Sequence, residues 1–384
     1  MVDAGTDSTS TSTDNTPTPP PLADVVIVDY ADLKKDGSRD NHQLLNLLEK
    51  AFGVDGPGLI AIRNVPGFVE GKKKFLPMAY DLISLPEDYL EGQVTDAKSL
   101  YNAGWSRGKE KMGDEPDYAK GSFYYNPYTD TPGSEEDRAK YPLSYPCNVW
   151  PKQKLPEFEG AAKDFGMLLK DVTTHLAKHL DAHLQTKVKF YKPETLYQAM
   201  KDTEKVKCRL LYYYPKDDAS KGKSSSWIGW HNDSGFLTAL AGDFYIDHTT
   251  GKLLDSCPDD QAGLYIADRQ DNLKRVVIPP DCMAIQIGEC SQILSGGTVC
   301  ATPHWVRSAS VKNVARISLA AFVDTPPAFP LCTPEGFSRE EVCHSDRQSK
   351  RVPPLDKRWT ENGLTFGKFL EQTFQMYYDW TTKS

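Results

Sequence analysis

Three side chains of metal-binding types are spaced so that they could surround one ion: His231, Asp233 and His304. Residues i and i+2 of a β-strand point to the same face, so His231 and Asp233 can reach a common ion. His304 begins a later β-rich run and is the best candidate for the third ligand. Two imidazoles and one carboxylate leave coordination positions open, which suits a catalytic metal ion. A His-x-Asp sequence alone is common on surface strands, so the interpretation depends on the residues downstream of His304.

Arg316 and Ser318 lie downstream of His304 in the apolar run ARISLAAFVD and share one face of the strand expected there. An arginine fork beside a hydroxyl suits a carboxylate that is held bidentately. An arginine inside an apolar strand is costly unless it is paired. The alternative interpretation of Arg316 is therefore a structural ion pair with one of the 53 acidic residues.

From about residue 24 to the C-terminus, the chain resembles the Fe(II)/2-oxoglutarate-dependent dioxygenases of the isopenicillin N synthase-like superfamily. The pattern of that family is His-x-Asp, a distal His and then Arg-x-Ser, and it is matched by His231, Asp233, His304, Arg316 and Ser318. The run QILSGG and the segments GSFYYNP, NVWP and LTFGKFL are also similar to this family. The gap between Asp233 and His304 is longer than usual, and the step from His304 to Arg316 is about two residues longer.

The resemblance also assigns roles to residues outside the metal pattern. In RLLYYYP, Tyr214 directly precedes Pro215 and matches the tyrosine that contacts the 2-oxoglutarate carboxylate, while Tyr212 stands where many relatives carry Asn. Residues 101–150 are rich in Tyr, Gly, Pro and charge, and this region lies over the iron in the family. The candidate substrate contacts are Asn102, Trp105, Arg107, Lys109, Tyr125 and Tyr212.

The resemblance implies a non-haem Fe(II)- and 2-oxoglutarate-dependent dioxygenase that oxidises a small-molecule substrate by hydroxylation, desaturation or oxidative ring closure. Its cofactors are Fe(II), 2-oxoglutarate and O2, with succinate and CO2 released. His231, Asp233 and His304 would hold the metal, and no catalytic residue is expected beyond them. Arg316, Ser318 and Tyr214 would bind 2-oxoglutarate. Two alternatives are an isopenicillin N synthase-like Fe(II) oxidase or cyclase acting without 2-oxoglutarate, and a non-catalytic metal-binding cupin-like protein.

The expected fold is mainly β with flanking helices, built on a double-stranded β-helix (jelly roll) core backed by a long helix. Short strands broken by Gly, Pro and Asp run from Val206 to Asp324, and Phe158–Leu184 has the apolar stripe of a long helix. His175, His179 and His183 on that helix indicate a solvated polar face more simply than a metal site. The predicted parts are a disordered segment 1–21, an N-terminal α/β region 22–200 that covers and backs the barrel, a jelly-roll catalytic core 201–330 and a C-terminal helical tail 331–384.

Composition excludes some partners. The net charge of −8 argues against nucleic-acid binding, which requires a basic cluster. No apolar run reaches the roughly 18 residues of a membrane helix. The eight cysteines are scattered without a CxxC pair, which disfavours a zinc knuckle and favours reduced thiols in the cytosol. We therefore expect a cytoplasmic monomer that acts on a small molecule, with an amino-acid-derived substrate preferred because such substrates recur in this branch.

Overall fold

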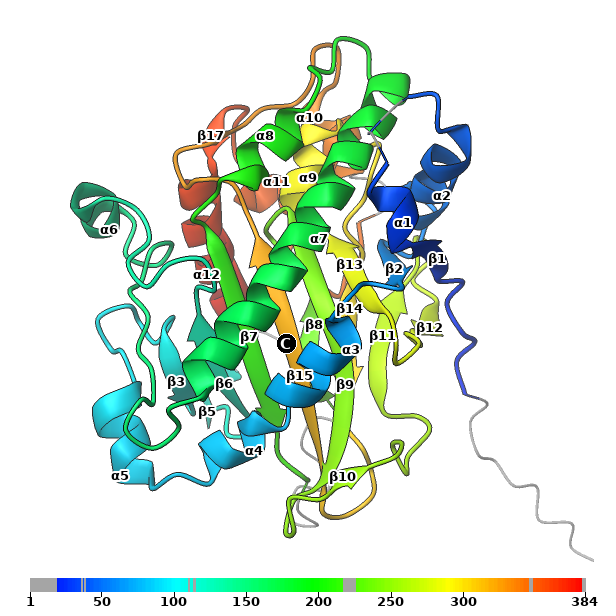
Figure 1. The fold of residues 1–384 in the computed structure, drawn as a ribbon. Coiled ribbons are helices and arrows are strands. Elements are labelled where there is room, and N and C mark those ends of the chain that lie inside the picture. Colours follow the sequence, from blue (N-terminus) through cyan, green and yellow to red (C-terminus); the bar gives the residue numbers. More distant parts are fainter. Residues whose placement is uncertain are drawn as a thin grey trace, which may run out of the picture.

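Two sheets hold most of the strands in the computed structural model, which describes residues 19–35, 37, 39–109, 111–112, 115–216, 226–344 and 348–381 (Figure 1). Among these residues the larger sheet has nine strands and the smaller has four. The larger sheet has the spatial order β1 (Val26–Asp29), β2 (Leu59–Arg63), β13 (Met283–Ile287), β9 (Leu237–Asp247), β15 (Val314–Val323), β7 (Val206–Tyr213), β6 (Lys120–Tyr125) and β3 (Gly104–Arg107), with β10 (Leu253–Leu254) paired to β9. The smaller sheet has the order β12 (Leu273–Arg275), β11 (Gly263–Ala267), β14 (His304–Arg307) and β8 (Ser226–His231). The prediction of a mainly β protein with flanking helices is confirmed.

The chain passes repeatedly between the two sheets from β7 onward. β7, β9, β13 and β15 lie in the larger sheet, whereas β8, β11, β12 and β14 lie in the smaller one. β1 and β2 pair in parallel, and the other pairs within the two sheets are antiparallel. The inner faces of the two sheets enclose a cavity lined by residues of both.

Strand β7 illustrates how the sequence divides between the two faces of the larger sheet. Arg209, Leu211 and Tyr213 alternate along the strand and line the cavity. Leu210 and Tyr212 point to the opposite face and belong to the main hydrophobic core. Because both faces are covered, the strand is a nearly continuous apolar and aromatic run.

The long helix α7 (Phe158–Lys187) packs against the outer face of the larger sheet, as Figure 1 shows, and matches the helix predicted from periodicity. Its buried stripe includes Leu169, Leu176 and Leu180, each of which stabilises the fold by roughly 1.5–3 kcal/mol on burial. The expectation of a solvated histidine face is wrong for two of its three members, because His179 and His183 are buried. Packing against the N-terminal segments covers this face of the helix.

The remaining elements lie around the two sheets. They are α1 (Tyr30–Leu33), α2 (His42–Phe52), α3 (Phe68–Phe75), α4 (Met78–Ile83), α5 (Glu87–Tyr89), the π-helix η1 (Leu90–Val94), β4 (Lys111–Met112), β5 (Glu115–Pro116), α6 (Glu135–Lys140), α8 (Thr195–Lys201), α9 (Glu289–Leu294), β16 (Pro330–Leu331), α10 (Arg339–Cys343), α11 (Leu355–Arg358), β17 (Leu364–Thr365) and α12 (Phe366–Thr381). Of these, α1, α2 and α3 pack against α7. The C-terminal helix α12 buries Phe366 and Phe369, and the ring of Phe366 lies 5.3 Å from that of Phe236.

Most of the predicted disordered segment 1–21 lies outside the described residues, which begin at residue 19. At that boundary, the carbonyl of Pro21 accepts a hydrogen bond of 2.9 Å from the backbone N–H of Arg275. Leu22 forms an isolated bridge with Arg275, so the chain runs alongside β12 from this point. In the part of the chain that the structure describes, no helix is long and apolar enough to cross a membrane.

Candidate active site

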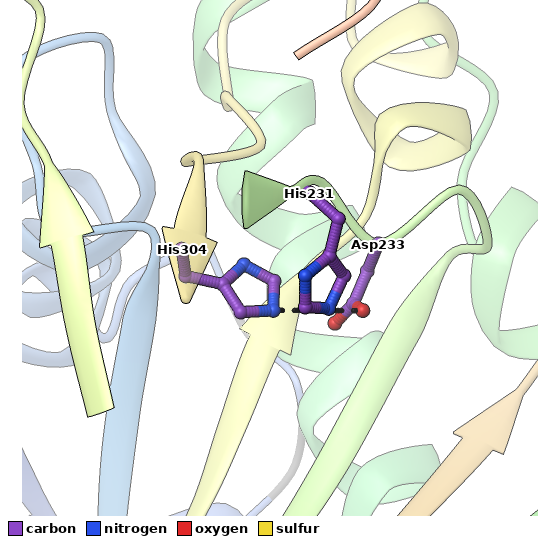
Figure 2. A group of neighbouring side chains, drawn as sticks. All are labelled: His231, Asp233 and His304. Atoms are coloured by element: carbon purple, nitrogen blue, oxygen red, sulfur yellow. Dashed lines mark ion pairs between the residues drawn. The ribbon is translucent and has the colours of Figure 1, made fainter. Parts of the chain in front are cut away.

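The three predicted metal ligands converge at one place on the cavity wall (Figure 2). His231 is the last residue of β8, His304 is the first residue of β14, and the two face each other in the antiparallel register of these strands. Their ring centroids are 4.1 Å apart. Asp233 lies in the turn after β8, with its Oδ1 atom 3.9 Å from Nε2 of His304. One ligand atom from each residue lies within 4.8 Å of the other two, so a single ion can contact all three.

The surroundings of the two histidines prepare them to act as neutral ligands. Burial lowers the pKa of His231 to about 3 and that of His304 to about 4, so each ring carries a free lone pair at neutral pH. Nδ1 of His231 lies 2.8 Å from the Gly229 carbonyl, and Nδ1 of His304 lies 3.1 Å from the Thr302 carbonyl. A carbonyl only accepts, so Nδ1 of His231 carries the proton and its Nε2 atom is left for a metal.

Asp233 gives an independent indication that a cation belongs here. Its Oδ2 atom is buried and has no hydrogen-bond partner among the described residues. Burial raises the pKa of Asp233, because the charged form loses its solvation. A bound divalent cation would satisfy the orphaned oxygen and stabilise the ionised carboxylate. The donor set of two imidazoles and one carboxylate fits Fe(II) with open positions for further ligands.

The turn that carries Asp233 is fixed by a buried network that was not predicted from the sequence. The backbone N–H of Glu289 donates to the carbonyl of Asp233 at 2.8 Å. The side chain of Asn232 donates to Glu289 at 2.8 Å, and its backbone N–H donates to the hydroxyl of Tyr377 at 3.0 Å. Glu289 in turn forms a two-pronged ion pair with Arg358, and both side chains are buried. The elements α9, α11 and α12 thus jointly hold the metal-ligand turn.

A cavity of about 460 Å³ extends from the three ligands between the two sheets. Its apolar walls come from both sheets and include Leu211, Leu240, Leu264 and Val306. Arg316 and Ser318 line it on β15, as the shared strand face predicts. The metal ligands and the predicted carboxylate-binding residues therefore open into one space.

Arg316 forms the structural ion pair considered in the sequence analysis and also keeps donor atoms that could bind a carboxylate. Its Nη2 atom pairs with Asp243 on the neighbouring strand β9, so the structural ion pair is present. Its Nε and Nη1 atoms are buried and have no hydrogen-bond partner among the described residues. Although burial disfavours a charge, Asp243 raises the pKa of Arg316, which stays a cation. The guanidinium thus keeps two donors without a partner among the described residues, on a residue that lines the cavity.

No protein-family model matches the sequence, and no curated protein is significantly similar to it. Solved structures match over nearly the whole chain. A full-length Neurospora crassa protein, solved in complex with α-KG and 5-formyluracil, superimposes with a TM-score of 0.63 at 17% identity, covering 91% of this chain and 95% of that chain. A Caulobacter crescentus protein assigned to the 2OG-Fe(II) oxygenase family gives 0.63 at 17%, covering 92% and 99%. JOX2, in complex with 2OG, Fe and JA, gives 0.60 at 18%, covering 92% and 86%.

The chain has the 2OG-Fe(II) oxygenase fold. The resemblance predicted from the sequence is confirmed at this level. At sequence identities of 17% and 18%, the superpositions establish the fold alone, so the chemistry has to be argued from the residues of the site.

Within this oxygenase fold, the tyrosines of β7 differ in placement from the expectation. Tyr213 lines the cavity, and the guanidinium of Arg316 lies 4.7 Å from its ring centroid. Tyr214 does not line the cavity; its ring centroid lies 3.9 Å from the guanidinium of Arg107. The hydroxyl of Tyr212 lies 2.8 Å from Nδ1 of His248 on the opposite face of the sheet. Strand pairing thus places Tyr213 on the cavity wall, and the role of Tyr214 in binding 2-oxoglutarate stays a prediction.

The other candidate substrate residues also lie outside the lining of the cavity, as far as the chain is described. Trp105 and Tyr125 are buried in the core, and Nζ of Lys109 forms an ion pair of 2.8 Å with Glu91. The side-chain oxygen of Asn102 accepts a hydrogen bond of 2.9 Å from Lys207. Their role in substrate binding stays a prediction.

Several charged or polar residues of the cavity were not singled out from the sequence, among them Lys72, Arg209, Asp243 and Gln286. The side chain of Gln286 contacts His304, with its amide nitrogen 2.7 Å from Nδ1 of that ring. Arg209 could have been found from the sequence, since it shares a strand face with Leu211 and Tyr213. Lys72 and Asp243 carry no such local signal, because their placement depends on contacts between distant elements.

Proposed function

We propose that this protein is a non-haem Fe(II)- and 2-oxoglutarate-dependent dioxygenase acting on a small molecule. The observation that carries the proposal is the convergence of His231, Asp233 and His304 on the wall of a cavity that also contains Arg316. 2-Oxoglutarate chelates a metal ion through its 2-oxo acid group and carries a second carboxylate at its other end. The three metal ligands and the unpartnered donors of Arg316 meet these two requirements. The fold shared with structures that hold α-KG or 2OG supports the same assignment.

The core is proposed to be a double-stranded β-helix, the jelly roll expected from the sequence. The strand order β13-β9-β15-β7 in the larger sheet and β12-β11-β14-β8 in the smaller one supports this topology. In this arrangement the metal ligands come from the smaller sheet and its turn, while Arg316 and Ser318 come from the larger sheet. The co-substrate would thus bridge the two sheets.

The residues of the site have separate tasks in this proposal. His231, Asp233 and His304 hold Fe(II), and Arg316 with Ser318 orients the distal carboxylate of 2-oxoglutarate by charge-assisted hydrogen bonds. Bound Fe(II), 2-oxoglutarate and O2 supply the oxidising chemistry, with release of succinate and CO2. The apolar walls exclude water and place the substrate beside the metal. Hydroxylation, desaturation and ring closure all use this arrangement and differ in how the substrate is positioned.

The direct test is to remove single metal ligands. His231→Ala and His304→Ala are each expected to abolish Fe(II) binding and turnover while the circular dichroism spectrum stays native. Anaerobic addition of Fe(II) and 2-oxoglutarate to the unaltered protein should give a weak visible charge-transfer band, and O2 should then yield succinate. His42→Ala is the matched control, because His42 is exposed on α2. Near-normal turnover of either ligand variant would mean that the ligand set is wrong.

The alternative of an isopenicillin N synthase-like oxidase keeps one supporting observation. Asp243 pairs with Arg316, so this buried arginine has a counter-ion within the protein and does not require 2-oxoglutarate to balance its charge. In that case Arg316 would hold the primary substrate, and O2 uptake would proceed without a 2-oxoglutarate band or succinate. A cupin-like binding protein would bind metal and show neither band nor O2 uptake. One assay therefore separates all three functions.

The substrate is proposed to be a small molecule that fits the cavity beside the metal. Related folds have been solved with 5-formyluracil, thymine or JA bound, which supports this size class. An amino-acid-derived substrate, the monomeric state and a cytoplasmic location stay predictions. Screening a library of amino acids and small acids for stimulated succinate release is the measurement that identifies the substrate.

A further inference from the structure

Lys72 is a buried lysine whose ammonium reaches the cavity from outside the larger sheet. It belongs to α3, which packs against α7, yet it is 3% exposed and lines the cavity. Among the described residues its one hydrogen bond is a long one, 3.4 Å from Nζ to the carbonyl of Pro280. Burial lowers the pKa of Lys72, and the neighbouring charge of Asp243 opposes that shift. The ring centroid of Phe244 lies 5.1 Å from Nζ, so a cation–π contact adds to this single hydrogen bond, but burying the ammonium is still costly.

A bulge in β9 creates the opening through which Lys72 passes. Ser318 of β15 pairs with Asp243, whereas Ala320 pairs with Leu240, so β9 contains one extra residue between these pairs. Gly242 lies at this point with a φ of 79°, a conformation that glycine adopts without strain. A Cβ atom on Gly242 would lie 3.0 Å from Nζ of Lys72. The glycine therefore provides both the backbone conformation and the space.

Asp243, directly after the bulge, is a carboxylate with a cation on either side. It pairs with Nη2 of Arg316 and interacts electrostatically with Lys72. This group of two cations and one anion has an excess of one positive charge. Both cations also lack full pairing, since Arg316 has two unpartnered nitrogens among the described residues and Lys72 has a single long hydrogen bond.

We propose that Asp243 is a shared counter-ion, paired with Arg316 before 2-oxoglutarate binds and with Lys72 afterwards. The inference rests on the proposed function. The distal carboxylate of 2-oxoglutarate takes the guanidinium of Arg316, and Asp243 turns to the ammonium at the bulge. A change between staggered rotamers re-aims a carboxylate without moving the backbone. Each cation then has one anion, whereas a fixed Asp243 would leave two carboxylates competing for one guanidinium.

Lys72 is thus a residue that determines co-substrate affinity without touching the metal. Two consequences distinguish a shared counter-ion from a fixed ion pair. Removing the charge of Asp243 should strengthen 2-oxoglutarate binding, because the competing anion is gone. Removing Lys72 should weaken it, because the displaced carboxylate then has no cation to receive it.

The test is a double-mutant cycle on the Fe(II)-loaded protein under anaerobic conditions, with Asp243→Asn, Lys72→Met and the double variant. Calorimetry measures the affinity for 2-oxoglutarate and for 2-oxobutanoate, which lacks the distal carboxylate. We expect Asp243→Asn to tighten 2-oxoglutarate about threefold and Lys72→Met to weaken it about fivefold, with the Lys72 effect falling below about twofold in the double variant. Lys74→Met is the matched control, since Lys74 is exposed on the same helix.

The effects should be confined to the ligand that carries the distal charge. Binding of 2-oxobutanoate should change little in all variants, whereas a general loss of structure would weaken both ligands. The proposal is overturned if Asp243→Asn weakens 2-oxoglutarate, or if Lys72→Met costs the same in both backgrounds. If the unaltered protein binds no 2-oxoglutarate at all, the proposed function fails first and the shared counter-ion fails with it. The separate readouts therefore distinguish the two failures.

Discussion

Two buried arginine–carboxylate pairs of this protein differ in how completely the arginine is used. Arg358 and Glu289 are 0% and 1% exposed and form two parallel contacts, 2.5 Å from Nη1 and 2.6 Å from Nη2. Arg316 and Asp243 meet through Nη2 alone, and the side chain of Asp243 is 27% exposed. In both guanidinium groups Nε has no partner among the described residues, but only Arg316 also leaves Nη1 without one.

We infer from the difference that the Arg358–Glu289 pair, here called the brace, is structural, whereas Arg316 is a candidate ligand site. The Nη2 atom of Arg358 also donates to the carbonyl of Pro353 at 2.9 Å, and Glu289 anchors the turn of Asp233. Both side chains of that pair are buried, and neither lines the cavity. Arg316 faces the cavity with unused donors, so its incomplete pairing is the feature that an incoming anion can complete.

The largest effect is expected from breaking the brace. Glu289→Ala leaves Arg358 as an uncompensated buried charge, and removal of one partner from such a pair destabilises proteins by about 3–5 kcal/mol. Urea unfolding followed by tryptophan fluorescence measures this loss. Asp243→Asn should cost less than half as much, because its pair opens onto the cavity. Equal losses for the two variants would contradict the distinction between the pairs.

Arg316→Ala should affect ligand binding more than stability. Loss of one partner of a buried charged hydrogen bond costs on the order of 2–5 kcal/mol, and each 1.4 kcal/mol is tenfold in affinity. The dissociation constant of 2-oxoglutarate is therefore expected to rise at least tenfold, while Fe(II) affinity stays nearly unchanged. Arg316→Lys should recover part of the loss, since lysine restores the charge without the fork. Unchanged 2-oxoglutarate binding with a weakened primary substrate would favour the isopenicillin N synthase-like alternative.

A smaller effect is expected from a change at Tyr377, which contacts the same turn as the brace. Tyr377→Phe removes the hydroxyl that accepts from the backbone of Asn232, between the two ligands of the turn. A neutral hydrogen bond contributes about 0.5–1.5 kcal/mol, so Fe(II) affinity should fall roughly threefold to tenfold. Competition with a metal chelator measures this change. Tyr197→Phe is a suitable control, because Tyr197 lies on α8, away from the turn. A loss of 2-oxoglutarate affinity without a loss of metal would show that the brace does not position the ligands.

The metal site could be predicted from sequence because its geometry is mostly local. His231 and Asp233 are close through their short spacing, although Asp233 lies in the turn after β8 and not on the strand, and His304 needed only to lie on a strand beside β8. The long helix α7 could be predicted from its apolar period for the same reason. The brace and its neighbour Tyr377 could not be predicted from local patterns. Glu289, Arg358 and Tyr377 lie on three different helices, which come together only in the tertiary structure.

The faces of β7 show where local reasoning fails. The family resemblance matched Tyr214, the residue before Pro215, to the tyrosine that contacts 2-oxoglutarate, but a strand face is set by the partner strands. β15 pairs Arg316 with Tyr213 and Ser318 with Leu211, and these residues point into the cavity together. A shift of one residue exchanges every side chain between the two faces, so an error of one position reverses the assignment.

The smallest expected effect tests this register directly by comparing two neighbouring tyrosines. Tyr213→Phe removes a hydroxyl from the cavity beside Arg316 and should weaken 2-oxoglutarate about threefold, within the roughly 0.5–1.5 kcal/mol of a neutral hydrogen bond. Tyr214→Phe should leave that affinity unchanged, because the ring of Tyr214 stacks with Arg107 outside the cavity lining. Both variants keep the aromatic ring, so packing is preserved and only the hydroxyl is lost. Anaerobic titration with 2-oxoglutarate measures the two affinities. The reverse result, an effect at Tyr214 and none at Tyr213, would support the assignment made from the family resemblance and would require β7 to shift by one residue against β15.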